Sequence, residues 1–154
     1  MNGQAGNEPR LIFPGLAGFY ASVSDLWYPM IRVAIGAILF MHGWAKLMGG
    51  AAGVTGFFTR IGLPMPGLLA YAAIFLETIG CICIAIGLFT RFFAAALAIE
   101  LLIAMLTVHW AAGFYVTASK SGVEYVLFLG IVMFAIALRG GGPYSVDRLI
   151  GKEL

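Results

Sequence analysis

The chain has 154 residues, of which 62% are hydrophobic and only 10% are charged, and its mean hydropathy is +0.99. This composition is too apolar for a soluble domain of this size and indicates a small polytopic membrane protein. Nine basic and seven acidic residues give a formal net charge of +2, and no basic patch with interleaved aromatic residues is present, which excludes a nucleic-acid-binding function.

The first apolar stretch, "RLIFPGLAGFYASVSDLWYP", is expected to lie in the membrane interface. Pro14 and Gly15 interrupt it and leave its apolar part too short to cross a bilayer, and it lacks the basic start and cleavage site of a secretory signal. Trp27 and Tyr28 suit the level of the lipid headgroups. We therefore expect residues 1–28 to form a cytoplasmic tail and an interfacial helix, with a re-entrant segment as the alternative.

Four longer apolar stretches predict four transmembrane helices. Each is close to the ~20 residues that cross a ~30 Å hydrocarbon core, although the last is somewhat short. Stretches rich in Gly, Pro or polar residues separate them, namely "GLPMPG", "LFTRFF" and "TASKSG". The expected spans are 29–49, 67–88, 92–112 and 122–138. The predicted fold class is an all-α membrane protein, a four-transmembrane-helix bundle over residues 29–139, followed by a cytoplasmic C-terminal tail at 140–154.

The basic residues predict the orientation of the bundle. With four spans both termini share one side, and this side, together with the turn between the second and third spans, carries six basic residues against three in the other loops. The positive-inside rule then places both termini in the cytoplasm of a bacterial inner membrane and the loop 50–66 outside. The six are Arg10, Arg32, Arg91, Arg139, Arg148 and Lys152, and the three are Lys46, Arg60 and Lys120.

Ionisable residues inside the spans are expected to form a polar cluster. A charged side chain facing lipid costs at least ~2.5 kcal/mol at the helix centre, so such groups should point into the bundle. Counting ~1.5 Å per residue places Glu77 and Glu100 near the bilayer midplane with His42 level with Glu77, and Lys46 level with Glu124. The candidate binding residues are Arg32, His42, Lys46, Glu77, Glu100 and Glu124.

The helix faces that carry these groups are also rich in small residues. Gly36 and Gly43 lie on the charged face of the first span, where glycine permits close helix packing. Glu77 and Glu100 lie on similar stripes of small residues in the second and third spans. Arg32, near the inner surface, can extend toward Glu100. The charged faces are therefore expected to be the packed faces.

A series of short motifs runs in order along residues 30–147: "RVAIGAILFMHGWAKL", Glu77 after a Pro and Gly entry, "GLFTR", "SGVEY" and "RGGGPYSVD". This series resembles the DoxX family of small four-span bacterial and archaeal membrane proteins. The resemblance implies a role in membrane redox or sulfur metabolism, since the family is associated with a terminal quinol oxidase and with thiosulfate oxidation to quinone. The family's polar pattern maps here onto His42, Lys46, Glu77, Arg91 and Glu124.

Two interpretations of the polar cluster remain open. One is a structural ion-pair network that fixes the helix register. The other is a proton-linked or ligand-binding site, in which His42 and Glu77 exchange protons with a bound quinol or an acidic sulfur substrate while Lys46 attracts its negative charge. Arg91 fits an interfacial anchor, and Glu100 has no counterpart in the family pattern, so any role for it depends on its chemistry alone.

Residues that could hold a cofactor are scarce. Cys81 and Cys83 point ~200° apart on a helix, which favours packing roles over a disulfide or a redox motif. Haem ligation by His42 and His109 is disfavoured, because His109 lies away from the packed face of its helix and beside Trp110. We expect no metal site and no phosphate loop. No cofactor is expected in this chain, although a quinone could bind.

The function predicted from the sequence is an integral membrane component of a redox assembly, linked to the quinone pool or to the oxidation of sulfur compounds. Its expected partners are membrane lipid and other membrane or redox subunits, one of which would hold the redox cofactor, and a homo-oligomer is also compatible. A small transporter or channel-like subunit is the first alternative. A structural subunit that packs against a larger membrane complex is the second.

Overall fold

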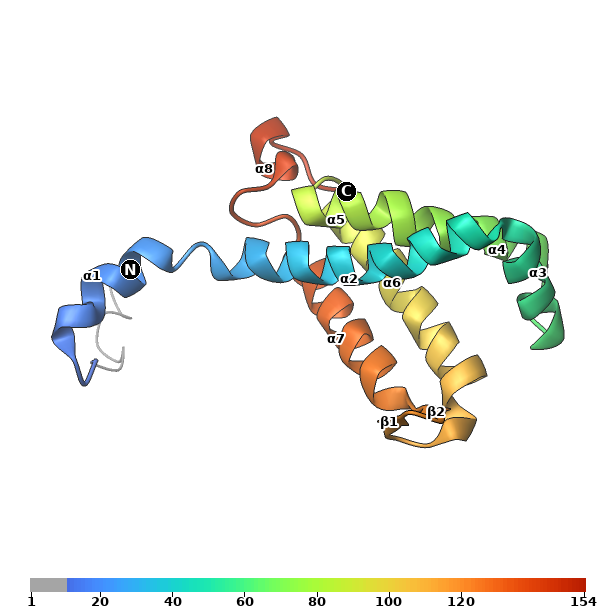
Figure 1. Ribbon diagram of the computed structural model, residues 1–154. Helices are drawn as coiled ribbons and strands as arrows, with labels where there is room; N and C mark the ends of the chain where they lie inside the picture. The colour runs from blue at the N-terminus through green and yellow to red at the C-terminus, as the bar shows by residue number, and fades with distance from the viewer. Residues whose placement is uncertain (1–10) are drawn as a thin grey trace.

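The computed structural model describes residues 11–154, and this part of the chain is mostly helical (Figure 1). Within it, three helices are long and apolar enough to cross a membrane: Trp27–Gly49, Pro66–Ile86 and Thr90–Ala112. The chain is a multi-pass membrane protein. The start of the expected cytoplasmic tail, residues 1–10, lies outside the described residues.

The first candidate span is a single helix, whereas the other two contain π-helical turns. Helix α2 covers Trp27–Gly49 without interruption. The second span consists of α4 (Pro66–Phe75), the π-helical turn η2 (Leu76–Gly80) and α5 (Cys81–Ile86). The third consists of α6 (Thr90–Ala104), the π-helical turn η3 (Met105–His109) and the 3₁₀ turn η4 (Trp110–Ala112).

The expected fourth span forms helix α7, which covers Val123–Arg139. It has 17 residues, fewer than the ~20 that cross a ~30 Å hydrocarbon core, so it is not among the three helices that qualify as candidate spans by length and composition, and the predicted count of four spans is not shown. Helix α7 lies along α6 (Figure 1), and a small antiparallel hairpin of β1 (Val116–Thr117) and β2 (Lys120–Ser121) precedes it.

The described N-terminal segment lies away from the bundle, at the blue end of the chain in Figure 1. It contains the 3₁₀ turn η1 (Pro14–Leu16) and helix α1 (Ala17–Val23), and neither has a buried residue. Pro14 occupies the first position of η1, where its missing N–H is not needed. Large apolar side chains of this segment, such as Phe13 and Phe19, are exposed.

The helices form two pairs that are close at one end and diverge toward the other (Figure 1). Helix α2 packs against η2 and α5, and α6 packs against α7. Gly36 and Gly43 make the first contact possible, because a Cβ atom at Gly36 would lie 2.8 Å from the carbonyl oxygen of Cys81, and one at Gly43 would lie 2.5 Å from that of Glu77. Between α2 and α4, the segment 50–66 contains helix α3 (Ala51–Arg60).

The C-terminal segment 140–154, expected as a tail, folds back over the close end of the bundle and contains helix α8 (Val146–Ile150). Its Asp147 side chain is 1% exposed and accepts hydrogen bonds from the amides of Phe89 (2.7 Å) and Thr90 (3.0 Å) and from the Thr90 hydroxyl (2.6 Å). A carboxylate at this position satisfies free N–H groups where α6 begins. The C-terminal segment therefore caps the N-terminal end of α6, although it is distant from α6 in the sequence.

Candidate functional site

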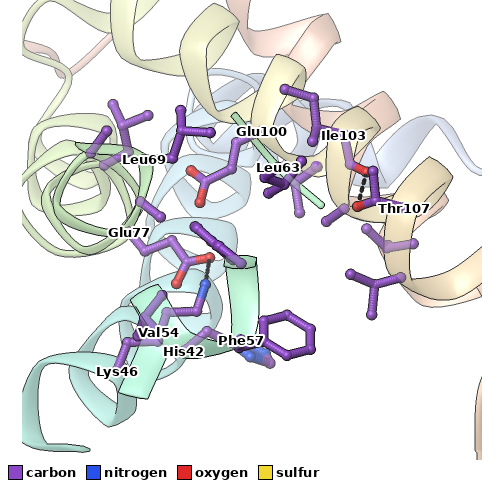
Figure 2. Close-up of a pocket in the computed structure, with 18 of the residues that line it drawn as sticks. His42, Lys46, Val54, Phe57, Leu63, Leu69, Glu77, Glu100, Ile103 and Thr107 are labelled. Carbon is purple, nitrogen blue, oxygen red and sulfur yellow. Dashed lines mark hydrogen bonds and ion pairs between the residues drawn. The ribbon is translucent and has the colours of Figure 1, made fainter. Parts of the chain in front are cut away.

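A cavity of about 630 Å³ lies between the diverging helix pairs. This volume falls within the ~300–1,000 Å³ of typical small-molecule pockets. Most of its walls are apolar side chains from α2, α4, α6 and α7, and α3 contributes Val54 and Phe57 (Figure 2). We call this space the bundle cavity.

The polar end of the bundle cavity holds three ionisable residues, Lys46, Glu77 and Glu100, which we call the acid–base cluster. Lys46 Nζ lies 2.5 Å from Glu77 Oε1, and the Glu77 side chain is only 8% exposed. The Glu100 side chain points toward Glu77 from α6 (Figure 2). Among the described residues, Oε2 of Glu77 and Oε2 of Glu100 are buried and have no hydrogen-bond partner. The cluster thus has unused acceptor atoms beside an open volume.

Both π-helical turns line the bundle cavity. Turn η2 carries Glu77, and turn η3 carries Thr107. Each π-helical turn also holds a threonine whose hydroxyl donates to a carbonyl four residues earlier: Thr78 Oγ1 to that of Ile74 (2.6 Å), and Thr107 Oγ1 to that of Ile103 (2.7 Å). Such turns occur frequently at functional sites.

Gly43 sets the distance between α2 and the Glu77 backbone. Because it has no side chain, α2 approaches η2 so closely that an added Cβ atom would lie 2.5 Å from the Glu77 carbonyl and 2.6 Å from the Glu77 Cβ atom. Lys46 follows three residues later, on the same side of the helix. The close approach therefore brings the lysine ammonium to the buried carboxylate.

The two histidines line the cavity but lie outside the acid–base cluster. The ring of His42 lies 6.3 Å from the ring of Tyr125, centroid to centroid, on α7. Nδ1 of His109 lies 2.6 Å from the carbonyl oxygen of Ser121, which ties η3 to the hairpin. Within residues 11–154, no three His, Cys, Asp or Glu residues are placed to hold a metal ion.

Glu124 lies outside the bundle cavity. Its Oε1 accepts a hydrogen bond from the amide of Val116 (2.6 Å) at the hairpin, and Lys46 pairs with Glu77 instead. Depth counting places Lys46 and Glu124 at one level, but α7 packs mainly on α6, and the Glu124 carboxylate binds the hairpin. Two residues at the same depth in the membrane are therefore not necessarily in contact.

Arg32 also lies outside the cavity, at the close end of the bundle. Its side chain is buried, with 1% of the residue exposed, and it donates to the carbonyl oxygen of Tyr144 (2.8 Å) in the C-terminal segment. Its guanidinium lies over the ring of Tyr28 and against Gly87, where a side chain would collide with it. Arg32 thus holds the C-terminal segment on α2 and does not extend to Glu100.

Arg91, which the sequence suggested as an interfacial anchor, binds the C-terminal end of α7 and the C-terminal segment of the chain. Its side chain pairs with Glu153 (2.7 Å) and donates to the carbonyl oxygens of Ala137 (3.1 Å), Leu138 (2.6 Å) and Arg139 (3.2 Å). These are carbonyl groups at the C-terminal end of α7, where no further turn of the helix satisfies them.

Cys81 and Cys83 are both buried as free thiols.

The sequence of this chain matches a known protein family. The DoxX profile matches residues 29–110, more than half of the chain. The chain belongs to the DoxX family. This confirms the resemblance seen in the sequence, although the motifs "SGVEY" and "RGGGPYSVD" lie beyond the matched residues.

Two relatives of this DoxX protein cover most of its length. A protein of Bacillus subtilis (strain 168) named "Putative oxidoreductase CatD" is 35% identical over 123 residues, which make up 80% of this chain and 86% of that protein. An uncharacterized protein of Haemophilus influenzae (strain ATCC 51907 / DSM 11121 / KW20 / Rd) is 28% identical over 124 residues, 80% of this chain and 90% of that protein. No solved structure matches.

Helix α3 of this DoxX protein was not predicted from the sequence. The segment 50–66 was expected as an outer loop, yet its helix supplies Val54, Phe57 and Phe58 to the cavity wall. A signal was present, since the apolar residues of "AAGVTGFFTR" recur three to four positions apart, as on one face of a helix. Tyr125 was likewise not singled out, and it lines the cavity; Thr107, on the predicted packed face of the third span, lines it too.

Proposed function

We propose that this DoxX protein is the membrane component of a redox assembly and that its bundle cavity binds a quinone. The observation that supports this most directly is an apolar cavity of about 630 Å³ that ends in the acid–base cluster. A quinone has an apolar body and polar oxygen atoms, so it suits apolar walls with hydrogen-bonding groups at one end. The oxidoreductase name of the Bacillus subtilis relative supports redox chemistry.

In this proposal a partner subunit carries the redox cofactor, and this chain binds the quinone and handles protons. Oxidation of a quinol releases two electrons, which the partner takes up, and two protons. The proton acceptors that line the cavity are the carboxylate of Glu77 and the imidazole of His42. If the partner instead oxidised a sulfur compound, the electrons would pass from that compound to the quinone and reduce it to quinol. The assembly forms in the lipid bilayer, with one or more copies of this chain.

We also propose that α7 is a fourth span and that both termini are cytoplasmic. At ~1.5 Å per residue α7 is about 25 Å long, a shortfall that slight thinning of the bilayer accommodates. The six-to-three distribution of basic residues supports the cytoplasmic side. A reporter active only in the cytoplasm should then work after Leu154 and fail when inserted at Gly53 in α3. Activity at both positions, or at Gly53 alone, would refute this topology.

The quinone proposal is tested on protein extracted in mild detergent. We expect mass spectrometry to find quinone in the purified protein and a short-chain quinone to bind with a saturable affinity. Filling the cavity with Ala104→Phe should weaken this binding at least tenfold, whereas Glu124→Gln, outside the cavity, should leave it unchanged. Absence of both bound quinone and saturable binding in the wild-type protein would refute the proposal.

A further inference from the structure

The acid–base cluster in the bundle cavity has one more carboxyl group than it has ammonium groups. The acid–base cluster has two carboxyl groups and one ammonium group, and the ammonium of Lys46 is 2.5 Å from Glu77. The lining residues from α3 and α4 are apolar. The titratable side chains that line the cavity are His42 and Lys46 from α2, Glu77 from η2, Glu100 from α6, His109 from η3 and Tyr125 from α7.

An unpaired carboxylate at this place is costly. A buried carboxylate without a cationic partner stays uncompensated in a medium of low polarity, where its charge is strongly disfavoured. Glu77 already has a cation, so the unpaired carboxylate is that of Glu100. A proton on Glu100 removes the charge and also supplies a donor for the Oε2 atom of Glu77, which has no partner among the described residues. The missing positive charge is thus supplied by a proton or by a ligand.

We propose that the bundle cavity binds apolar monovalent cations and that each bound cation displaces one proton from Glu100. In this exchange the O–H bond of the Glu100 carboxyl group breaks, the proton passes to water, and the carboxylate pairs with the cation; no electron is transferred. Lys46 stays with Glu77 throughout. This activity goes beyond the proposed redox role and does not rest on it.

The walls of the cavity specify the rest of the ligand. A hydrated inorganic ion gains little from apolar walls, whereas an organic cation with an apolar shell buries its surface there. Ile99 and Ile103 line the cavity and are also 60% and 42% exposed on a helix that is a candidate span. Such side chains face lipid in a membrane, so a ligand dissolved in the bilayer meets the cavity beside Glu100.

The sign of the charge separates this proposal from the expectation that Lys46 attracts an acidic substrate. An anion in the cavity would have to compete with Glu77 for the lysine ammonium and would lie beside a second acidic group. A cation meets the unused carboxyl oxygens directly. Two probes of the same shape and opposite charge, tetraphenylphosphonium and tetraphenylborate, therefore discriminate between the two cases.

The decisive measurement uses the wild-type protein in detergent and titration calorimetry between pH 6 and pH 8. We expect tetraphenylphosphonium to bind at least tenfold more tightly than tetraphenylborate. While Glu100 is protonated in the free protein, its affinity should rise by up to about tenfold per pH unit, with about one proton released per cation. Equal affinity for the two probes, or binding of the phosphonium that does not change with pH, would overturn the proposal.

Variants locate the exchanged proton. Glu100→Gln should abolish the pH dependence and weaken phosphonium binding at least tenfold, whereas Glu124→Gln, outside the cavity, should change neither. His42→Ala should retain the pH dependence. If His42→Ala loses it and Glu100→Gln keeps it, the proton is on the histidine and the proposal is wrong. Quinone that binds without any phosphonium binding would also overturn it and leave the redox role intact.

Discussion

Replacing Gly43 with alanine is the sharpest test of how the acid–base cluster is assembled. The added Cβ atom would lie 2.5 Å from the carbonyl carbon and oxygen of Glu77 and 2.6 Å from its Cβ atom, whereas ordinary contacts are 3.4–4 Å. The neighbours are mostly backbone atoms, so they cannot rotate away. Relief requires α2 and η2 to separate by roughly 1 Å, which a closely packed interior resists. Overpacking alone should cost about 1–3 kcal/mol, and more if the ion pair with Lys46 is broken.

Two other glycines of α2 provide matched controls for Gly43→Ala. Gly49 has no atom within 4 Å of its added Cβ, so Gly49→Ala should be neutral or stabilise by up to about 1 kcal/mol through helix propensity. Gly36→Ala, with the carbonyl oxygen of Cys81 at 2.8 Å, should fall between them. The assay is thermal unfolding in one detergent, followed by circular dichroism. If Gly43→Ala melts as high as Gly49→Ala, the close approach of α2 to Glu77 does not exist.

Two further perturbations test the cap and the ion pair by the same unfolding assay. Asp147→Ala removes three hydrogen bonds from the start of α6 and should lower the free energy of unfolding by about 2 kcal/mol, while Asp25→Ala, at an exposed carboxylate, should change it by less than about 0.5 kcal/mol. Equal effects would show that the C-terminal segment does not cap α6. Lys46→Met should destabilise the protein because Glu77 loses its cation, and adding Glu77→Gln should recover part of the loss; strictly additive effects would exclude the pair.

The extent of each candidate span follows from the sequence because it depends on a local property, the length of an apolar run. The expected first span, 29–49, and helix Trp27–Gly49 differ by two residues at one end. Packing through Gly36 and Gly43 follows equally from the sequence, since glycines seven residues apart share a helix face. The π-helical turns have no such signature, because "LETIG" and "MLTVH" are equally suited to an α-helix.

The partners of charged residues depend on which helices are neighbours, and this property is not local. Depth counting gives the height of a residue along the membrane normal, but it does not say which helix stands opposite. Lys46 therefore pairs with Glu77 rather than with Glu124, which binds the hairpin. Arg32 binds the C-terminal segment for the same reason, since that segment covers the close end of the bundle.

A neutral quinone and an apolar cation require opposite protonation states of Glu100, although both would occupy the bundle cavity. The quinone carries no charge, so it leaves the proton in place as compensation, whereas the cation displaces it. Raising the pH from 6 to 8 should therefore weaken quinone binding, or leave it unchanged, and strengthen tetraphenylphosphonium binding by up to about a hundredfold. The two ligands should also compete, and phosphonium should expel quinone more readily at the higher pH. If both affinities rise together with pH, a group other than Glu100 controls the cavity, and the charge balance of the acid–base cluster does not determine what it binds.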